Sequence, residues 1–189
     1  MYICLKLNFK YMKTKLTEER IYSIIKYAIN AHDNVNQTYD NKPYSIHLYA
    51  VAAYVTKYKK LIKGDYDKVF CAAFTHDLIE DARETYNDVK FNSNHTIAEL
   101  TYALTNEKGK TRDDRANDKY YAEMKLVEDA VFLKICDRLA NMKYSIDTQS
   151  SMARKYAKEY ENFKSKIYDP AYDSMFNELE KMCDEIKKG

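Results

Sequence analysis

Four ionisable side chains lie within six residues of an otherwise apolar stretch. The segment FTHDLIEDA contains His76, Asp77, Glu80 and Asp81, and apolar residues precede it. Imidazole and carboxylate groups are costly to bury unless they are paired or bind a metal ion. The segment therefore allows two interpretations. It is either the end of a helix whose acidic groups lie in solvent, or a set of side chains around a bound cation.

The spacing of these four residues would place them on shared faces of a helix. Residues four apart are neighbours on a helix surface, so His76 would lie beside Glu80, and Asp77 beside Asp81. The residues VFCAAF before them are apolar on nearly all sides, which predicts a central and buried helix. On this segment alone, both interpretations remain open.

Two polar residues elsewhere favour the cation. His47 lies in the apolar segment SIHLYAVAAYV, where a lone histidine is more often structural, and Asp137 lies in VFLKICDRLA, where the neighbouring Arg138 could pair with it. Together with His76 and Asp77, they supply two imidazoles and two carboxylates from apolar helices. That donor set suits an octahedral divalent metal with positions left open for water.

The order of these residues resembles that of the HD-domain metal-dependent phosphohydrolases. The finer resemblance is to the hydrolase domains of the RelA/SpoT alarmone enzymes and their small stand-alone relatives. Three motifs are similar in the same order: PYSIH (43–47), HDLIED (76–81) and KICDRLAN (134–141). The loop ALTNEKGKTRDDR (103–115) is similar to the region between the last two motifs. The resemblance covers roughly residues 18–145.

The resemblance implies an all-α HD fold and one divalent metal ion, usually manganese. A water molecule bound to such an ion becomes a nucleophile near neutral pH, and a nearby carboxylate can accept its proton. By motif position, Glu80 and Asp81 would orient and help to deprotonate that water, and Asn141 would contact the nucleotide sugar or order the site. The implied metal ligands are His47, His76, Asp77 and Asp137.

One departure from the alarmone hydrolases concerns the nucleotide. These enzymes have an Arg-Lys pair shortly before the first motif, which holds the guanine or a phosphate, whereas this chain has Thr38 and Tyr39 there. Lys42 could replace part of the pair or be a solvated loop lysine, and Tyr39 could stack on a base. We expect an intact metal site and an altered nucleotide pocket, with phosphate contacts from the charged loop that contains Lys108, Lys110, Arg112 and Arg115.

The elements that must position these residues are predicted to be helices. Only 3 Gly and 2 Pro interrupt the 189 residues, which favours long helices with short connections. N-caps are predicted at Thr17 and Asp65, and a capping box at Thr96 with Glu99. We expect one HD-type domain over residues 1–189, with the motif core at about 18–145 and C-terminal helices at 150–188. The main predicted helices span residues 18–32, 45–60, 65–82 and 171–187.

Composition excludes several other classes. With 31 Lys+Arg against 29 Asp+Glu, the net charge of +2 gives no electrostatic reason for a nucleic-acid partner. No run approaches the ~20 apolar residues of a membrane span. The N-terminal segment lacks the pattern of a signal peptide. The four scattered cysteines are expected as reduced thiols of a cytoplasmic protein, and the oligomeric state stays open.

The function predicted from these motifs is metal-dependent hydrolysis of a nucleotide, with a (p)ppGpp-like 3′-pyrophosphate as the first candidate. Few residues follow the last motif, so we expect no further catalytic domain after it. The altered pocket keeps a second candidate open, an HD phosphohydrolase of a dNTP, NADPH or a nucleoside phosphate. A third is a non-catalytic HD module that binds a nucleotide. Glu80 and Asp81 argue against this third candidate, because a pure binding protein needs no water-activating carboxylates.

Overall fold

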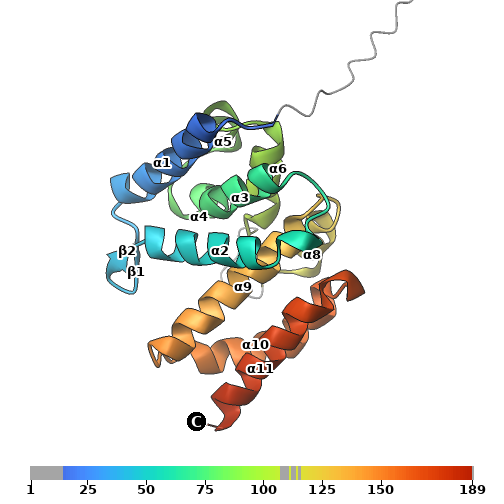
Figure 1. The fold of residues 1–189 in the computed structure, drawn as a ribbon. Helices are drawn as coiled ribbons and strands as arrows, with labels where there is room; N and C mark the ends of the chain where they lie inside the picture. Colours follow the sequence, from blue (N-terminus) through green and yellow to red (C-terminus); the bar gives the residue numbers. More distant parts are fainter. Residues whose placement is uncertain (1–14, 107–110, 112–113, 115, 189) are drawn as a thin grey trace, which may run out of the picture.

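A computed structural model describes residues 15–106, 111, 114 and 116–188 of the chain. Within these residues the fold is a helical bundle, and the only strands belong to one short hairpin (Figure 1). The expectation of an all-α fold is therefore confirmed. The hairpin consists of β1 (Thr38–Tyr39) and β2 (Lys42–Pro43), which pair antiparallel between α1 and α2.

Most of the described helices are joined by short connections. In chain order they are α1 (Glu18–Asn34), α2 (Ser45–Lys57), η1 (Lys59–Leu61), α3 (Tyr66–Thr75), α4 (Leu78–Asp81), α5 (Tyr86–Asn92), α6 (His95–Leu104), α8 (Asp118–Met124), α9 (Ala130–Asp147), α10 (Met152–Ile167), η2 (Pro170–Tyr172) and α11 (Asp173–Lys188). None of these helices is both long enough and apolar enough to cross a bilayer.

Side-chain caps define where several of these helices begin. Thr17 Oγ1 and Asp65 Oδ1 each accept the backbone N–H three residues further on, so both predicted N-caps are confirmed. The predicted capping box at Thr96 is wrong. Asn94 caps α6 instead, because its Oδ1 accepts the N–H of Ile97 at 3.0 Å. The asparagine lies one position before His95, which is already helical.

The predicted helix over residues 65–82 is interrupted at the chemically important pair. It ends as α3 at Thr75 and resumes as α4 at Leu78, and Asp77 between them has φ −101° and ψ 2°. Neighbouring side chains on an uninterrupted helix point about 100° apart. The interruption allows His76 and Asp77 to face the same point. The prediction of one continuous helix over residues 65–82 is therefore wrong at His76 and Asp77.

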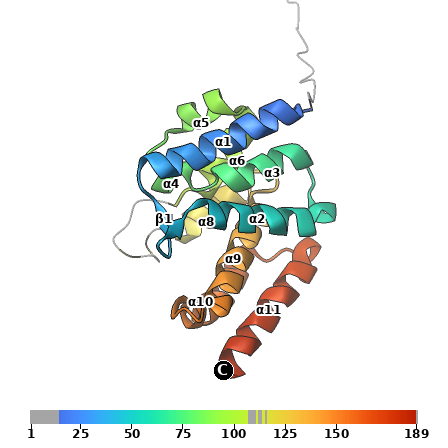
Figure 2. The ribbon, with the colours of Figure 1, turned by 60° about the vertical axis from the view of Figure 1, so that its left-hand side comes forward.

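Helix α3 is the buried centre of the fold, as its apolar sequence predicts. It packs against α1, α2, α6 and α9, and these helices surround it in Figures 1 and 2. Its small residues allow the close approach of several helices at once. The side chains of α3 buried in the core are Val69, Cys71, Ala72, Ala73, Phe74 and Thr75.

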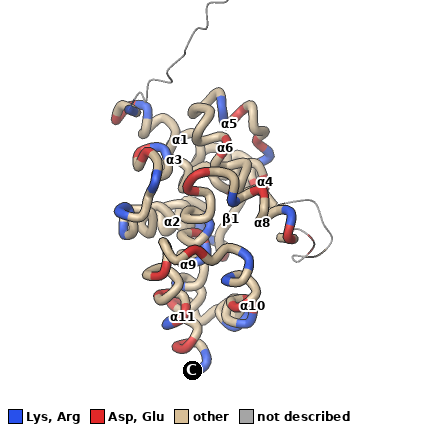
Figure 3. The backbone as a smooth tube through the Cα atoms, turned by 90° about the vertical axis from the view of Figure 1, so that its right-hand side faces the viewer, with Lys and Arg blue, Asp and Glu red and all other residues tan. Residues whose placement is uncertain are grey.

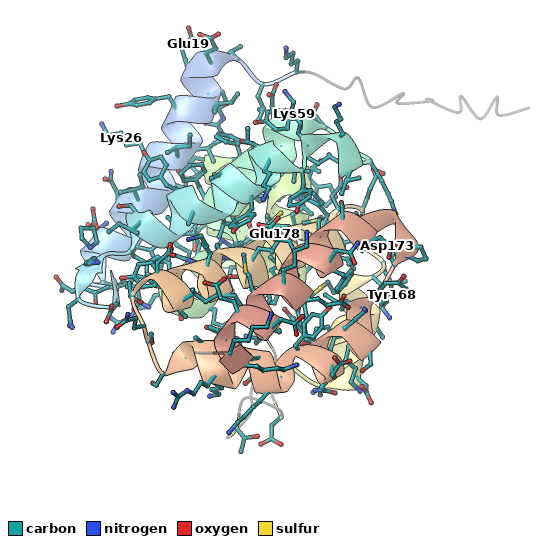
Figure 4. All side chains as sticks on the ribbon, turned by 60° about the horizontal axis from the view of Figure 1, so that its bottom comes forward. Glu19, Lys26, Lys59, Tyr168, Asp173 and Glu178 are labelled. Carbon is teal, nitrogen blue, oxygen red and sulfur yellow. The ribbon has the colours of Figure 1, made fainter. Side chains whose placement is uncertain are left out.

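Helix α9 packs against α2, α3 and α6 on one side and against the C-terminal pair α10 and α11 on the other (Figure 2). On α11, the Glu178 carboxylate accepts hydrogen bonds from Lys57 Nζ at 2.6 and 2.7 Å, and Figure 4 shows it against α2. The cysteines on α3, α9 and α11 are buried free thiols, as expected, and Cys4 lies outside the described residues. Lysine and arginine are interspersed with acidic residues over the described backbone (Figure 3).

Candidate metal centre and active site

The four predicted metal ligands meet between α2, the α3–α4 junction and α9. His47 Nε2 lies 3.3 Å from His76 Nε2, 3.5 Å from Asp77 Oδ2 and 3.4 Å from Asp137 Oδ1. His76 Nε2 lies 3.0 Å from Asp77 Oδ2 and 3.8 Å from Asp137 Oδ1. Donor atoms at right angles around an ion ~2.2 Å away would be ~3.1 Å apart. The spacing of His47, His76 and Asp137 therefore fits a single divalent ion, and Asp77 Oδ2 lies within 3.5 Å of both imidazole nitrogens.

The hydrogen bonding of His76 leaves its inner nitrogen free to bind that ion. His76 Nδ1 lies 3.0 Å from the carbonyl oxygen of Ala73, which can only accept a hydrogen bond. In its neutral form the imidazole would carry its proton on Nδ1, and its Nε2 lone pair would point toward His47. Two facing imidazole nitrogens at 3.3 Å need a proton or a cation near them.

The charges of the cluster also favour a cation at its centre. Burial opposes charge on His47, but hydrogen bonds with Asp137 and Asp77 outweigh it and raise the pKa of the imidazole to about 9. Burial likewise opposes ionisation of both carboxyls. The pKa of Asp77 is nevertheless lowered, mainly by His76, and that of Asp137 mainly by Lys134. A divalent ion would satisfy the same carboxylates that otherwise hold a proton on the imidazole.

Asp137 is fixed at both of its oxygens. Lys134 Nζ donates to Oδ2 at 3.1 Å, and Asn141 Nδ2 donates to Oδ1 at 2.6 Å. Arg138, the neighbour considered as the partner of Asp137, instead donates to Glu159 Oε2 on α10 at 3.1 Å. Sequence reasoning missed the role of Lys134. Its position three residues before Asp137 on one helix face is the signal that could have identified it.

Tyr44 connects a predicted ligand with a predicted water-handling residue. Its hydroxyl donates to Asp77 Oδ2 at 2.5 Å and lies 3.3 Å from Asp81 Oδ2. Its ring is buried and stacks on His32 of α1, with the ring centroids 4.2 Å apart. Sequence reasoning quoted this tyrosine only as part of PYSIH. Its contact with Asp77 spans 33 residues of the chain and depends on the folded arrangement.

Glu80 and Asp81 lie beside the cluster and line a cavity of about 230 Å³ together with His47, Asp77 and Asp137. Asn106 Nδ2 holds Glu80, donating to its two carboxylate oxygens at 3.0 and 2.9 Å. Burial raises the pKa of Asp81 to about 6, and the charges of Asp77 and Glu80 add to this effect. A carboxylate beside the ligands, rather than among them, has the position that a proton acceptor requires.

Of the residues predicted to contact the nucleotide, only Asn141 is among the described residues that line the cavity. Asn141 lines the cavity, but its carbonyl oxygen accepts the Tyr39 hydroxyl at 2.7 Å. The Tyr39 ring stacks on His47, at a centroid distance of 4.9 Å. Lys42 is exposed on the hairpin, and its Nζ lies 5.5 Å from the centroid of the Tyr144 ring. Arg112, like Lys108, Lys110 and Arg115, lies outside the described residues.

Two cations that were not predicted as phosphate contacts line the cavity. They are Lys134 and Arg138, and both come from the KICDR segment of α9. Each is already bonded to a carboxylate, Asp137 in one case and Glu159 in the other. Positive groups next to the cavity could stabilise an anionic ligand while their carboxylate partners keep them in place.

Comparisons with known proteins agree with this geometry. The sequence model of the HD domain family matches residues 25–170. Three curated proteins are each 30% identical over 84% of this chain. They are the bifunctional (p)ppGpp synthase/hydrolase SpoT of Escherichia coli (strain K12), and the guanosine-3′,5′-bis(diphosphate) 3′-pyrophosphohydrolases of Escherichia coli O157:H7 and Shigella flexneri. The match covers 23% of each relative, so the chain spans about a quarter of their length.

One solved structure has a similar fold. It comes from work describing a metazoan ortholog of SpoT that hydrolyses ppGpp and plays a role in starvation responses. The TM-score is 0.66, and the match covers 91% of this chain and 98% of that chain. Sequence identity is 17%, so this similarity concerns the fold.

Proposed function

Because the chain belongs to the HD domain family, we propose that it is a metal-dependent phosphohydrolase that removes the 3′-pyrophosphate from a (p)ppGpp-like nucleotide. The observation that carries the proposal is the cluster of His47, His76 and Asp137, with Asp77 against both imidazoles, beside a polar cavity that two further carboxylates also line. Metal-assisted hydrolysis needs an ion site and an adjacent proton acceptor. The substrate class follows from the names of the curated relatives.

In this proposal His47, His76, Asp77 and Asp137 hold one divalent ion, expected to be manganese. When bound, such an ion lowers the pKa of water and offsets charge on phosphoryl oxygens. Glu80, fixed by Asn106, and Asp81, with a pKa raised to about 6, accept the proton of the attacking water. The water adds across the 3′ ester bond, so that a 3′-hydroxyl and free pyrophosphate are the products. We expect this activity in the cytoplasm.

A second candidate, the hydrolysis of another nucleotide, is favoured by the nucleotide side of the site. Thr38 and Tyr39 stand where the alarmone hydrolases have an Arg-Lys pair, and the Tyr39 ring and hydroxyl are already engaged by His47 and Asn141. Lys42 is not among the described residues that line the cavity. A dNTP, NADPH or a nucleoside phosphate would use the same metal chemistry with different contacts to the base.

The test is a nucleotide panel assayed with the manganese-loaded protein. The protein is treated with a chelator, reloaded with Mn²⁺, and incubated with ppGpp, dNTPs, NADPH and nucleoside phosphates, while phosphate and pyrophosphate are detected separately. We expect pyrophosphate from ppGpp in the presence of metal only. Asp77→Asn should abolish this release. Asp147→Asn, an exposed change on α9 beyond the site, should not.

Each other outcome of the panel separates the alternatives. Products from another nucleotide, with none from ppGpp, would replace the first candidate with the second. Tight nucleotide binding in Mn²⁺ without any cleavage would contradict the hydrolase and leave a binding module.

A further inference from the structure

The β1–β2 hairpin has a turn of fixed geometry. Its strands pair Tyr39 with Lys42 across a two-residue turn, and both turn residues have positive φ, 54° at Asp40 and 61° at Asn41. Positive φ at both central positions is typical of a type I′ turn, and Asp and Asn tolerate this conformation better than most residues. The turn therefore fixes the hairpin, and Figure 1 shows β1 and β2 beside the N-terminal end of α2.

The hairpin contacts α9 at two levels. At the outer level, the Tyr144 hydroxyl donates to Asp40 Oδ2 at 3.2 Å, and Lys42 Nζ lies over the Tyr144 ring. At the inner level, the Tyr39 hydroxyl donates to Asn141 Oδ1 at 2.7 Å. Both contacts bridge the same two elements, but only the inner one reaches a residue that is bonded to a metal ligand.

Asn141 transmits the inner contact to the metal site. Its Nδ2 donates at 2.6 Å to Asp137 Oδ1, the oxygen that lies 3.4 Å from His47 Nε2. A carboxylate can only accept hydrogen bonds, so the amide nitrogen must face Asp137 and the amide oxygen must face away. The Tyr39 hydroxyl donates to that outward oxygen and so favours this orientation. Without it, the amide could turn and place its oxygen against the Asp137 carboxylate.

Tyr39 also touches a second ligand through its ring. The ring lies nearly parallel to the His47 imidazole, with an interplanar angle of 22° and a centroid distance of 4.9 Å. One side chain thus packs against one predicted ligand and orients the residue bonded to another. The sequence suggested Tyr39 as a stacking partner for a base, but these contacts commit its hydroxyl and ring to the metal site.

Building on the metal site of the proposed function, we infer that Tyr39 is a positioning residue of the metal centre. Its hydroxyl fixes the Asn141 amide, and that amide fixes Asp137 Oδ1 toward the ion. The partners that orient metal ligands typically change metal affinity by about 10–100-fold when they are removed. The hydroxyl of Tyr39 acts on Asp137 through the Asn141 amide and not directly, so its removal should lower Mn²⁺ affinity by about 10-fold.

The test measures Mn²⁺ binding to chelator-treated protein by isothermal titration calorimetry, without any substrate. Tyr39→Phe keeps the ring and removes only the hydroxyl, and it should weaken Mn²⁺ binding about 10-fold. Tyr144→Phe is the matched control, because it removes the other tyrosine hydroxyl between hairpin and α9, and its affinity should equal that of the wild type. Circular dichroism melts verify that both variants fold.

A double-mutant cycle distinguishes positioning through Asn141 from a general weakening of the fold. In an Asn141→Ala background, Tyr39→Phe should cause no further loss of Mn²⁺ affinity. The inference is overturned if Tyr39→Phe binds Mn²⁺ like the wild type, or if its loss is the same in both backgrounds. A protein that shows the expected pattern but cleaves no nucleotide would support this inference and contradict the proposed hydrolase.

Discussion

His32 on α1 is a buried histidine without a hydrogen bond. Its side chain is 0% exposed, and neither ring nitrogen has a partner among the described residues. Burial lowers the pKa of the imidazole from its ordinary 6.5 to about 4, although the charge of Asp77 opposes this shift. The folded protein therefore keeps His32 neutral at a pH where the unfolded chain would take up a proton.

This difference links stability to pH in a defined direction. The pKa of His32 is lower in the folded protein than in the unfolded chain. Protonation of His32 therefore costs no stability well above pH 6.5, and it lowers the free energy of unfolding as the pH drops from 6.5 to about 4. The difference between the two pKa values corresponds to a total loss of about 3 kcal/mol in the free energy of unfolding. About 2 kcal/mol of it should be lost between pH ~7.5 and pH ~5.

We expect His32→Phe to remove this part of the pH dependence. Phenylalanine keeps an aromatic ring against Tyr44 but has no group to protonate. Guanidinium unfolding followed by circular dichroism gives the free energy of unfolding at both pH values, with a chelator present so that metal binding does not contribute. Between the two pH values, the wild type should lose about 2 kcal/mol more than the variant.

The control is His95→Phe, which replaces a histidine whose side chain is 58% exposed on α6. This variant keeps His32, so it should still show the loss of stability on acidification that the buried His32 ring causes. If wild type and His32→Phe lose the same stability on acidification, the buried ring is not held neutral by the fold and the reasoning is refuted.

Three further changes test other contacts. Asp77→Ala should abolish both tight Mn²⁺ binding and turnover, and a variant that still binds Mn²⁺ in calorimetry would contradict the ligand assignment. Glu80→Gln should keep the fold and the metal but lower kcat by ~10²-fold or more, the usual scale for losing a general base; wild-type turnover would mean that Glu80 only balances charge. Gly64→Ala would place its Cβ 2.9 Å from Asp129 Oδ2, which also accepts the Gly64 N–H. It should cost about 1–2 kcal/mol in thermal unfolding, and an unchanged melting temperature would show that the Asp129 carboxylate can move aside.

Short stretches of sequence predict much of the local structure of this chain. The Thr17 and Asp65 caps and the burial of α3 were predicted correctly, because each depends on residue types within a few positions. The sequence also identified a chemically consistent donor set. His47, His76 and Asp137 are costly to bury singly, so their shared occurrence in apolar segments implied a common centre.

Only the tertiary structure determined how the donor side chains are oriented and which hydrogen bonds hold them in place. Periodicity predicts a continuous helix through His76 and Asp77, whereas in the structure α3 ends at Thr75 and α4 begins at Leu78. The supporting contacts join residues far apart in the chain. Tyr44 with Asp77, and Tyr39 with Asn141, are separated by 33 and 102 positions, respectively.

The pairing of Asp137 shows the physical reason for this division. Sequence adjacency suggested Arg138, but successive residues on a helix point in different directions. Lys134, one turn earlier, reaches the Asp137 carboxylate, while Arg138 turns to Glu159 on α10. Residue types determined that a buried carboxylate needs a cation. Which cation it meets was determined by helix geometry and by the packing of α10 against α9.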